Sequence, residues 1–470
     1  MTFSDRSGAV SDPIKIKSPM DPMTACHVVA VPYPGRGHVN PMLNLCKLLA
    51  GDGRLLITVV VTEEWLRLLA AENPPRRIRF AAIPNVLPSE ADRAADMPSF
   101  VAATQTKMEE PLEKLLDRLD RPVHFIIADT FLNWAVEFGN RRNIPVASLW
   151  AMPASVFAVF HHFDRLVRHG HHPADLSERG DERVSYVPGI PSIRLADLPS
   201  IAFMADQRLL RLTRSIFPNV SKAQFLLFTT IYGIESEVVD ALQEEFPFPI
   251  YTFGPACIPY SGLQTSAAAD YLAWLDAQPP NSVLYVSLGS FLSVSSRQMD
   301  EIAGGLKDSG VRFLWVARGE AARLQAACGD GDVAGRGRVV AWCDQLRVLC
   351  HRAVGGFWTH CGWNSTMEAI FAGVPIIAFP IVMDQVTIRK HVVEDWRIGW
   401  DGRRGRLPSE LQRREEIAGM VKEFMDSESA DRRRMAARAK QVRKVATDAM
   451  ADGGSTNQNL TSFLNHILNV

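Results

Sequence analysis

The feature that most constrains the fold is a repeated alternation of short apolar segments with stretches of helical spacing. The first half carries the apolar segments CHVVAVP, LLITVVVT, IRFAAIP, VHFIIAD and PVASLW. Continuous apolar runs of this length are typical of strands buried on both faces, and the helical stretches between them supply the crossovers of a parallel sheet. The first half therefore predicts a doubly wound α/β sheet.

The same alternation restarts after a polar, proline-bearing stretch at residues 255–269. The second half carries SVLYVSLGS, RFLWVAR, RVVAWC, AVGGFWTH and PIIAFP. A chain of 470 residues is too long for one ordinary core, so two domains are expected. We predict two Rossmann-like domains facing each other across a cleft. The expected parts are a flexible segment at 1–22, a first domain at 23–254, a linker at 255–269, a second domain at 270–452, and a C-terminal helix at 453–470 that packs back on the first domain.

Composition narrows the choice of partners and compartment. The formal net charge is -1 at pH 7, and 47% of the residues are hydrophobic, so no global field favours nucleic acid. Seven cysteines without framework spacing indicate a reducing compartment rather than a disulfide-stapled protein. The chain has no apolar run of the roughly 18 residues that a membrane span needs, and residues 1–22 are not expected to act as a signal peptide. We expect a monomeric, cytoplasmic protein with no membrane span and no nucleic-acid partner.

A histidine and an aspartate are predicted to meet at one edge of the first sheet. His38 lies in PYPGRGHVNP after the first strand, before helical spacing at residues 39–50, and Asp129 ends the fourth strand. Open α/β sheets bind ligands at this edge. A carboxylate behind an imidazole fixes its tautomer and stabilises the imidazolium, as a general base requires. The alternatives are an exposed or capping histidine and an aspartate that caps the next helix.

The stretch at residues 342–385 combines two apolar strands with a polar turn. A strand ends at His360, a glycine-containing turn follows, a helix is expected to begin at Asn364, and a second strand leads to Asp384 and Gln385. Free N–H groups at a helix start, with the Asn364 and Ser365 side chains beside them, suit a phosphate or diphosphate. His360 can add a further donor.

None of the histidine, cysteine or aspartate groups has the spacing of a metal site. The histidines at positions 161, 162, 169, 171 and 172 have no carboxylate or thiol at ligand spacing, so they are not expected to hold an ion. Cysteines and histidines between residues 343 and 361 fit no zinc spacing. The D-x-D of Asp330 and Asp332 lies in a glycine-rich turn and is expected to be a surface loop. We predict no metal.

The stretch at 342–385 closely resembles the signature box of plant UDP-dependent glycosyltransferases of small molecules, glycosyltransferase family 1. The resemblance extends to PYPGRGHVNP, ADTF, YVSLGS and the C-terminal helices. It implies the two-domain GT-B fold and an inverting transfer of glucose from UDP-glucose to a hydroxyl of a small lipophilic acceptor, a phenolic, flavonoid, terpenoid or hormone. The product would be a β-glucoside, and UDP-glucose would be a co-substrate with no further cofactor. The alternatives are a non-catalytic UDP-sugar-binding protein and a GT-B UDP-sugar epimerase.

The resemblance also implies residue roles. His38 would be the general base with Asp129 behind it. Trp342 would stack on uracil beside Gln345, and Glu368 would accept from the ribose hydroxyls. The expected UDP-sugar-binding residues are Ser290, Trp342, Cys343, Gln345, His360, Gly362, Trp363, Asn364, Ser365, Glu368, Asp384 and Gln385. Within that set, Ser290, His360, Asn364 and Ser365 would hold the diphosphate, while Trp363, Asp384 and Gln385 would contact the sugar.

Two further expectations follow from the same comparison. A closing glutamine such as Gln385 is associated in the family with glucose rather than galactose. Cys343 and Asp344 stand where the family often has Ala-Pro. This departure is expected to alter the loop near the uracil base. On the acceptor side, the apolar side chains of Phe131, Met152 and Phe157 are expected to line the pocket.

Overall fold

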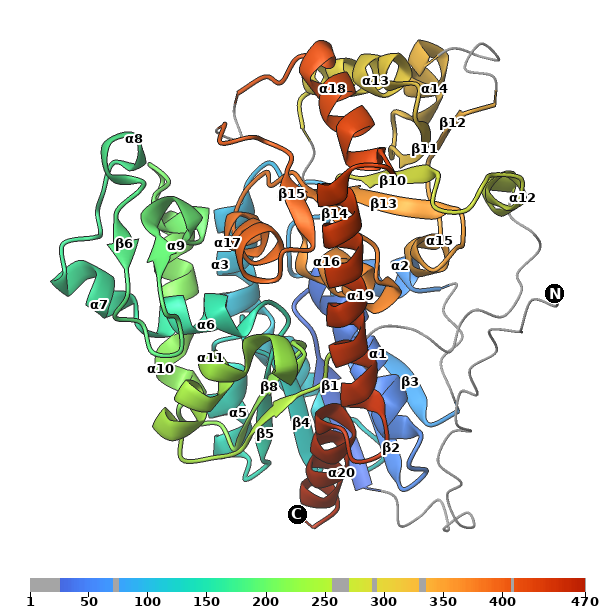
Figure 1. Cartoon of the computed structure of the whole chain (residues 1–470). Helices are drawn as coiled ribbons and strands as arrows, with labels where there is room; N and C mark the ends of the chain where they lie inside the picture. Colours follow the sequence, from blue (N-terminus) through green and yellow to red (C-terminus); the bar gives the residue numbers. More distant parts are fainter. Residues whose placement is uncertain are drawn as a thin grey trace.

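The chain forms two parallel sheets, each wrapped by helices, in a computed structural model that describes residues 26–70, 76–255, 270–289, 294–328, 335–406 and 410–469 (Figure 1). The first sheet has the order β3-β2-β1-β4-β5-β8-β9 and the second β12-β11-β10-β13-β14-β15. All pairings within both sheets are parallel. Both domains therefore have the doubly wound architecture that the sequence predicts.

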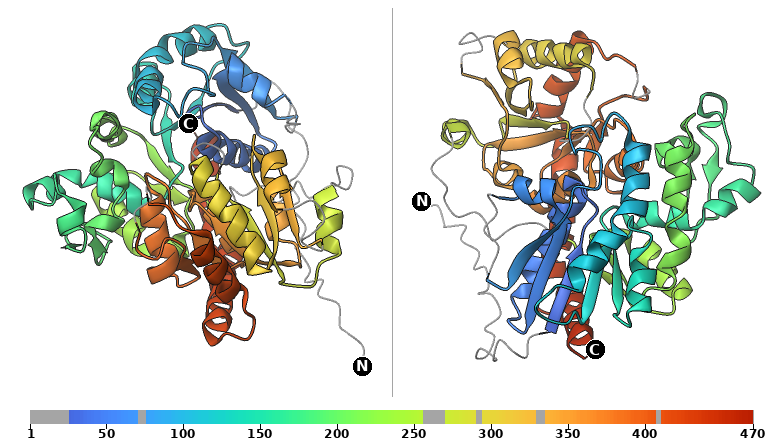
Figure 2. Two further views of the ribbon diagram at one scale, coloured as in Figure 1. Left: turned by 90° about the horizontal axis from the view of Figure 1, so that it is seen from above. Right: turned by 180° about the vertical axis from the view of Figure 1, so that it is seen from behind.

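The strand bounds follow the apolar segments closely. The first sheet consists of β1 (Cys26–Val31), β2 (Leu55–Thr62), β3 (Ile78–Ile83), β4 (Phe125–Asp129), β5 (Val146–Trp150), β8 (Phe225–Phe228) and β9 (Ile250–Thr252). The second consists of β10 (Val283–Ser287), β11 (Arg312–Val316), β12 (Gly337–Val340), β13 (Val354–Thr359), β14 (Ile376–Ala378) and β15 (Gly399–Asp401). A small antiparallel pair, β6 (Arg183–Val184) and β7 (Ile193–Arg194), belongs to a lobe that projects from the first domain (Figure 2).

The helices of the first domain are α1 (Arg36–Ala50), α2 (Glu63–Leu68), α3 (Met97–Lys107), α4 (Glu109–Leu116), α5 (Ala135–Arg141), α6 (Ala154–His161), α7 (Phe163–Arg168), α8 (Leu176–Arg179), α9 (Arg208–Arg214), α10 (Phe217–Val220) and α11 (Tyr232–Glu245). Those that follow are α12 (Asp270–Asp276), α13 (Ser296–Ser309), α14 (Ala321–Cys328), α15 (Gln345–Leu349), α16 (Trp363–Ala372), α17 (Gln385–Lys390), α18 (Arg414–Met425), α19 (Ala430–Met450) and α20 (Ser455–Leu468).

Each sheet is buried on both faces because alternate side chains of its strands enter different apolar clusters. In β1, Val29 and Val31 belong to one cluster, whereas Val28 and Ala30 belong to the other. The second sheet is likewise covered by two clusters. Side chains alternate across a strand, so the continuous apolar segments of the sequence are what two covered faces require.

Helix α1 begins earlier than its apolar spacing indicates. It starts at Arg36 rather than at residue 39, so His38 lies in its first turn and not in the loop before it. Pro41 lies inside this helix. Proline has no N–H to donate to the carbonyl four residues earlier, and that carbonyl belongs to Gly37. The Gly37 oxygen is therefore available to a partner outside the helix.

The two domains meet along the C-terminal edges of their sheets. Asn364 Nδ2 donates to the Gly37 oxygen at 3.0 Å, and Met383 N–H donates to Ser200 Oγ at 2.6 Å. An ion pair joins the partly buried Arg389 to the buried Asp197. These contacts bring loops of the first domain against the strand ends of the second.

The C-terminal helices connect the domains a second time. Helix α19 runs from the second domain towards the first, and α20 lies against the first sheet beside β9 (Figure 1). Phe463 of α20 packs edge-on against Phe125 and Phe225, and it belongs to a core cluster of the first domain.

Among the residues that the structure describes, no helix combines the length and the apolar character needed to cross a lipid bilayer.

Candidate active site

His38 and Asp129 meet at the C-terminal edge of the first sheet. His38 Nδ1 lies 2.8 Å from Asp129 Oδ2, and the His38 side chain is 18% exposed while Asp129 is 1% exposed. Asp129 Oδ1 accepts the Phe131 N–H at 3.0 Å. One carboxylate oxygen thus orders the loop after β4, and the other orients the imidazole. With Nδ1–H donated to the carboxylate, Nε2 is free to take a proton.

Aromatic rings surround the imidazole. The His38 ring lies 4.9 Å from the Tyr33 ring and 5.6 Å from the Phe131 ring, centroid to centroid. Phe131 in turn stacks on Trp150 at 5.6 Å and 13°. Phe131 and Met152 are each partly buried. The space next to the base therefore has apolar walls.

Phe157 is not a pocket residue. Its side chain is fully buried in α6, with the rings of Trp150, Phe217 and Phe228 within 5.3 Å, centroid to centroid. The expectation that it contacts an acceptor was wrong. An aromatic run at helical spacing fills the core between α6 and the sheet, which accounts for the residue without a ligand.

His360 lies at the end of β13 between two glycines. A Cβ at Gly289 would lie 2.8 Å from His360 Nε2, and one at Gly362 would lie 2.5 Å from it. Gly289 has φ +95°, a conformation that favours glycine. Burial lowers the pKa of His360 to about 4, against a hydrogen bond to the Ser287 backbone, so the imidazole is neutral at pH 7 and carries a single N–H.

Helix α16 starts directly after this turn with exposed backbone donors. It begins at Trp363, one residue before the expected start, and Gly362 provides no side-chain cap. The first N–H groups of a helix need partners and carry the positive end of the helix dipole. The N-terminus of α16 and the neutral His360 imidazole therefore face the same space, which suits an anion.

Gln345, Ser365 and Glu368 form one hydrogen-bonded group. Gln345 Nε2 donates to Glu368 Oε2 at 2.6 Å and to Ser365 Oγ at 2.9 Å. Tyr285 Oη donates to Gln345 Oε1 at 3.2 Å and lies 3.3 Å from Cys343 Sγ. The glutamine thus orients the carboxylate. Tyr285 was not anticipated, because it lies within a strand rather than at a strand end.

Burial raises the pKa of Glu368 to about 7, and this gives a pH prediction for donor binding. A carboxylate accepts hydroxyl donors better than a carboxylic acid. The affinity for UDP-glucose should therefore rise between pH 6 and pH 8, by up to about tenfold if only the ionised form binds. Isothermal titration across this range measures it, since the diphosphate diester of UDP-glucose keeps its charge throughout.

The control for this titration is Glu368→Gln. This variant should bind UDP-glucose more weakly, and its affinity should not rise with pH. An unchanged pH profile in Glu368→Gln would show that another group titrates.

The raised pKa of Glu368 also has a consequence for the stability of the fold. The contribution of Glu368 to folding is fully present below its ordinary pKa of 4.5 and is lost as the pH rises through about 7.

Trp342 and Cys343 differ sharply in exposure. The Trp342 side chain is 62% exposed, an unusual state for a large aromatic ring. Cys343 is 6% exposed, and burial raises the pKa of its thiol to about 12. Asp344 caps α15 by accepting the Arg347 N–H at 3.1 Å. The Cys-Asp pair therefore anchors the loop and leaves the indole free to stack on a ligand.

Trp363 and Asn364 both reach the first domain. The Trp363 indole N–H donates to Thr229 Oγ1 at 3.2 Å, and the residue is 4% exposed. The indole N–H is therefore used within the domain interface, and the expected contact of Trp363 with the sugar stays a prediction. Its backbone N–H remains at the helix start. Thr229 directly follows β8, so a search of strand ends for polar residues would have found it.

Asp384 and Gln385 follow β14 beside the backbone turn at residues 381–383. Gln385 Oε1 accepts the Ile381 and Val382 N–H groups at 2.8 and 3.1 Å. Its Nε2, which makes no hydrogen bond to any described residue, can donate to a ligand. Burial raises the pKa of Asp384 to about 6, and the charge of His38 acts against that rise. Asp384 and His38 therefore lie close enough to interact electrostatically across the domain interface.

Four expectations fall outside the described residues. They concern the segment at 1–22, Ser290, the D-x-D of Asp330 and Asp332, and residues 256–269 of the expected linker. The remaining predicted donor residues follow β12, β13 and β14 or lie in α15, α16 and α17.

Comparison with known proteins places this arrangement in a family. A sequence model described as UDP-glucoronosyl and UDP-glucosyl transferase matches residues 220–401. UDP-glycosyltransferase 87A2 of Arabidopsis thaliana is 48% identical over 448 residues, covering 94% of this chain and 97% of the relative. The chain belongs to the plant UDP-glycosyltransferases. It is a glycosyltransferase enzyme.

Solved structures confirm the GT-B fold of this UDP-glycosyltransferase. Medicago truncatula UGT71G1 complexed with UDP-glucose has a TM-score of 0.80 and 25% identity, covering 94% of this chain and 98% of that one. Phytolacca americana UGT2, complexed with UDP-2fluoro-glucose and pterostilbene, has a TM-score of 0.78 and 26% identity over 95% of this chain and all of that one. The glycosyltransferase is also 32% identical to (R)-mandelonitrile beta-glucosyltransferase of Prunus dulcis, covering 96% of this chain and 99% of the relative.

Proposed function

We propose that this UDP-glycosyltransferase moves glucose from UDP-glucose to a hydroxyl of a small lipophilic acceptor, with inversion to the β-glucoside. The observation that carries the proposal is the 2.8 Å pair of His38 and Asp129 facing, across the domain interface, the helix start and the carboxylates of the second domain. A base on one wall and an anion site on the other are what a direct displacement needs.

In this reaction the acceptor oxygen attacks the anomeric carbon as the bond from that carbon to the diphosphate breaks. The hydroxyl proton passes to His38 Nε2, and the Asp129 carboxylate stabilises the imidazolium through Nδ1–H. The bonding pair leaves with UDP. Donors already in place stabilise that developing charge at no cost in reorganisation, and the start of α16 and the neutral His360 supply them.

On the donor side, Trp342 stacks on uracil, Glu368 accepts from the ribose hydroxyls, and Gln345 orients that carboxylate. Asp384 and the Gln385 amide contact the sugar. The relatives support glucose as that sugar, because one is named a beta-glucosyltransferase and one was solved with UDP-glucose. The Gln385 amide, with its oxygen held by two backbone N–H groups, supports a donor role towards a sugar hydroxyl.

On the acceptor side, the rings of Tyr33, Phe131 and Trp150 favour an aromatic or other apolar alcohol. The wall next to the base offers the ring faces of Tyr33 and Phe131. Compounds such as pterostilbene, bound by a structural relative, share this character. The apolar character also argues against a sugar epimerase, whose reaction needs no acceptor.

The test is a screen of UDP-sugars against phenolic, flavonoid, terpenoid and hormone alcohols, with products identified by mass spectrometry. We expect UDP-glucose to give hexosylated products with at least one class. If UDP-sugars bind and no acceptor is modified, the chain is a binding protein. Conversion of one UDP-sugar to another without an acceptor would identify an epimerase.

Because amides, hydroxyls and the His360 imidazole stabilise the leaving group, we propose that the transfer needs no divalent metal. Incubation with EDTA should leave kcat within about twofold of the untreated value. If a metal assisted the transfer, its removal would raise the barrier by several kcal/mol and slow the reaction far more. Steady-state assays at 25 °C measure this. Loss of activity with EDTA and recovery with Mg²⁺ or Mn²⁺ would contradict the proposal.

We also propose that the protein works in the cytoplasm. No disulfide joins the six cysteines within the described residues, and four of them are buried. Thiols that form no disulfide are typical of a reducing compartment.

A further inference from the structure

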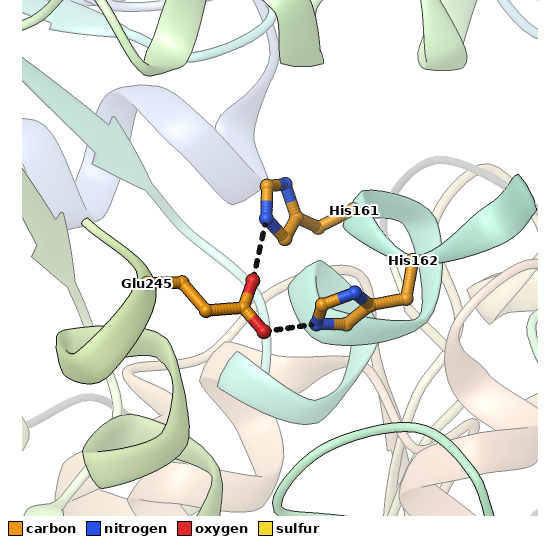
Figure 3. A group of neighbouring side chains, drawn as sticks. All are labelled: His161, His162 and Glu245. Atoms are coloured by element: carbon orange, nitrogen blue, oxygen red, sulfur yellow. Dashed lines mark hydrogen bonds and ion pairs between the residues drawn. The ribbon is translucent and has the colours of Figure 1, made fainter. Parts of the chain in front are cut away.

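Two histidines and a glutamate from distant parts of the chain converge at the junction of α6 and α11 (Figure 3). His161 is the last residue of α6, His162 follows it, and Glu245 is the last residue of α11. His161 Nε2 lies 3.1 Å from Glu245 Oε2, and His162 Nε2 lies 3.3 Å from Glu245 Oε1. The three side chains point towards one another from the two helix ends.

The cluster could not be predicted from residue spacing in the sequence. The histidines were expected to lack a carboxylate partner, because none lies nearby in the chain. Glu245 comes 84 residues after His161 and meets it only because α11 packs against α6. The expectation was wrong on this point. Spacing along the chain does not detect ligands that tertiary packing brings together.

His162 lacks the hydrogen bond that a buried imidazole normally makes. The residue is 8% exposed, and its Nε2 lies 3.3 Å from Glu245 Oε1 without hydrogen-bond geometry and makes no hydrogen bond to any other described residue. Buried polar atoms are nearly always satisfied. A polar atom that faces a carboxylate within a cluster of metal-ligating groups, without a well-formed hydrogen bond, suits a bound ion.

The surrounding structure favours a cation and holds the ligands. Both α6 and α11 end at the cluster, and the C-terminus of a helix carries partial negative charge. The His161 ring stacks on Phe157 at 22° and lies 5.1 Å from the Phe246 ring, centroid to centroid. At the other end of α6, Glu235 of α11 accepts the Ala154 and Ser155 N–H groups, both at 2.9 Å.

We propose that His161, His162 and Glu245 bind a divalent transition-metal ion of the zinc type, which joins the C-terminal end of α6 to that of α11. Two imidazoles and one carboxylate are a known zinc donor set, with a fourth position left to water. Zinc bonds of about 2.0–2.2 Å place two ligand atoms at most roughly 4 Å apart. The ligand atoms already lie within 4.8 Å of one another, so side-chain rotation closes the site.

The ion stabilises the acceptor domain and takes no part in the transfer. None of its three ligands belongs to the His38–Asp129 pair or to the donor residues at the start of α16. The alternative is that Glu245 only accepts hydrogen bonds from the two imidazoles. A metal site and a cluster held only by hydrogen bonds predict different effects of added zinc on the protein.

The test uses the full chain without an affinity tag, stripped of metal and titrated with Zn²⁺ against a chromogenic chelator. We expect one tight equivalent per chain, with Kd below roughly 1 μM, and a Tm that rises when zinc is added. Co²⁺ in place of zinc should give the visible absorption of a tetrahedral site. If the titration shows no tight equivalent and the Tm does not rise, the proposal is overturned.

Matched variants separate this site from other histidines. Glu245→Gln keeps the side-chain shape and His162→Asn keeps a polar group, and each should weaken zinc binding at least tenfold while retaining glycosyl transfer without zinc. His169→Ala is the control, because His169 is exposed and stacks on Tyr186 at 4.0 Å, outside the cluster. Zinc affinity unchanged in Glu245→Gln, or lost equally in His169→Ala, would contradict the assignment.

Discussion

His38→Ala is expected to bind UDP-glucose with wild-type affinity and to transfer glucose about 10²- to 10⁴-fold more slowly. The variant removes the nitrogen that takes the acceptor proton, so the hydroxyl must attack without a base. The donor residues are untouched, because they lie in the second domain. Isothermal titration of UDP-glucose and a single-turnover assay on the same preparation measure both quantities. Turnover close to wild type would rule out the proposed base.

Asp129→Asn is the companion variant. Its Oδ1 can still accept the Phe131 N–H, which bonds Asp129 at 3.0 Å, so the loop after β4 should keep its conformation. The amide cannot stabilise an imidazolium as a carboxylate does. We expect slower transfer at unchanged UDP-glucose affinity. A loss of thermal stability without a kinetic defect would show that Asp129 serves only the loop.

Trp342→Ala is expected to weaken UDP-glucose binding roughly 5- to 150-fold, since stacking of a base on an aromatic side chain contributes about 1–3 kcal/mol. The indole is 62% exposed, so little folding free energy depends on it, and Tm should stay near wild type. Isothermal titration measures the change.

Trp342→Phe is the matched control, because a smaller ring retains a stacking face and should recover most of the affinity. His38 transfers a proton and Trp342 only binds, so kcat at saturating UDP-glucose should fall far less in Trp342→Ala than in His38→Ala. Wild-type affinity in Trp342→Ala would mean that uracil does not lie on this ring.

The fold could be predicted from sequence because strands buried on both faces must be apolar throughout. The segments CHVVAVP and VHFIIAD match β1 and β4 within two residues at each end. The spacing of apolar residues does not give the start of α1. Apolar spacing located α1 from Val39 onwards, whereas the helix begins at Arg36, since the first turn of α1 points towards the other domain and needs no apolar side chain.

Much of the candidate site could also be placed, because polar residues at strand ends meet at one edge of a parallel sheet. His38 and Asp129 follow this rule. Contacts set by tertiary packing could not be placed. The indole of Trp363 turns to Thr229, and the Phe157 ring enters the core. Glu245 reaches His161 from another helix. No local pattern records which neighbour a buried side chain will meet.

The central claim is that an acceptor hydroxyl, activated by His38, displaces UDP directly from the face opposite the leaving group. The most direct measurement is the anomeric configuration of the product, read from the proton coupling at the anomeric carbon by NMR. Transfer from α-linked UDP-glucose should give the β-glucoside alone, with the large coupling of two axial protons. An α-glucoside would contradict the account, because retention requires a different path from the one that His38 and Asp129 can support.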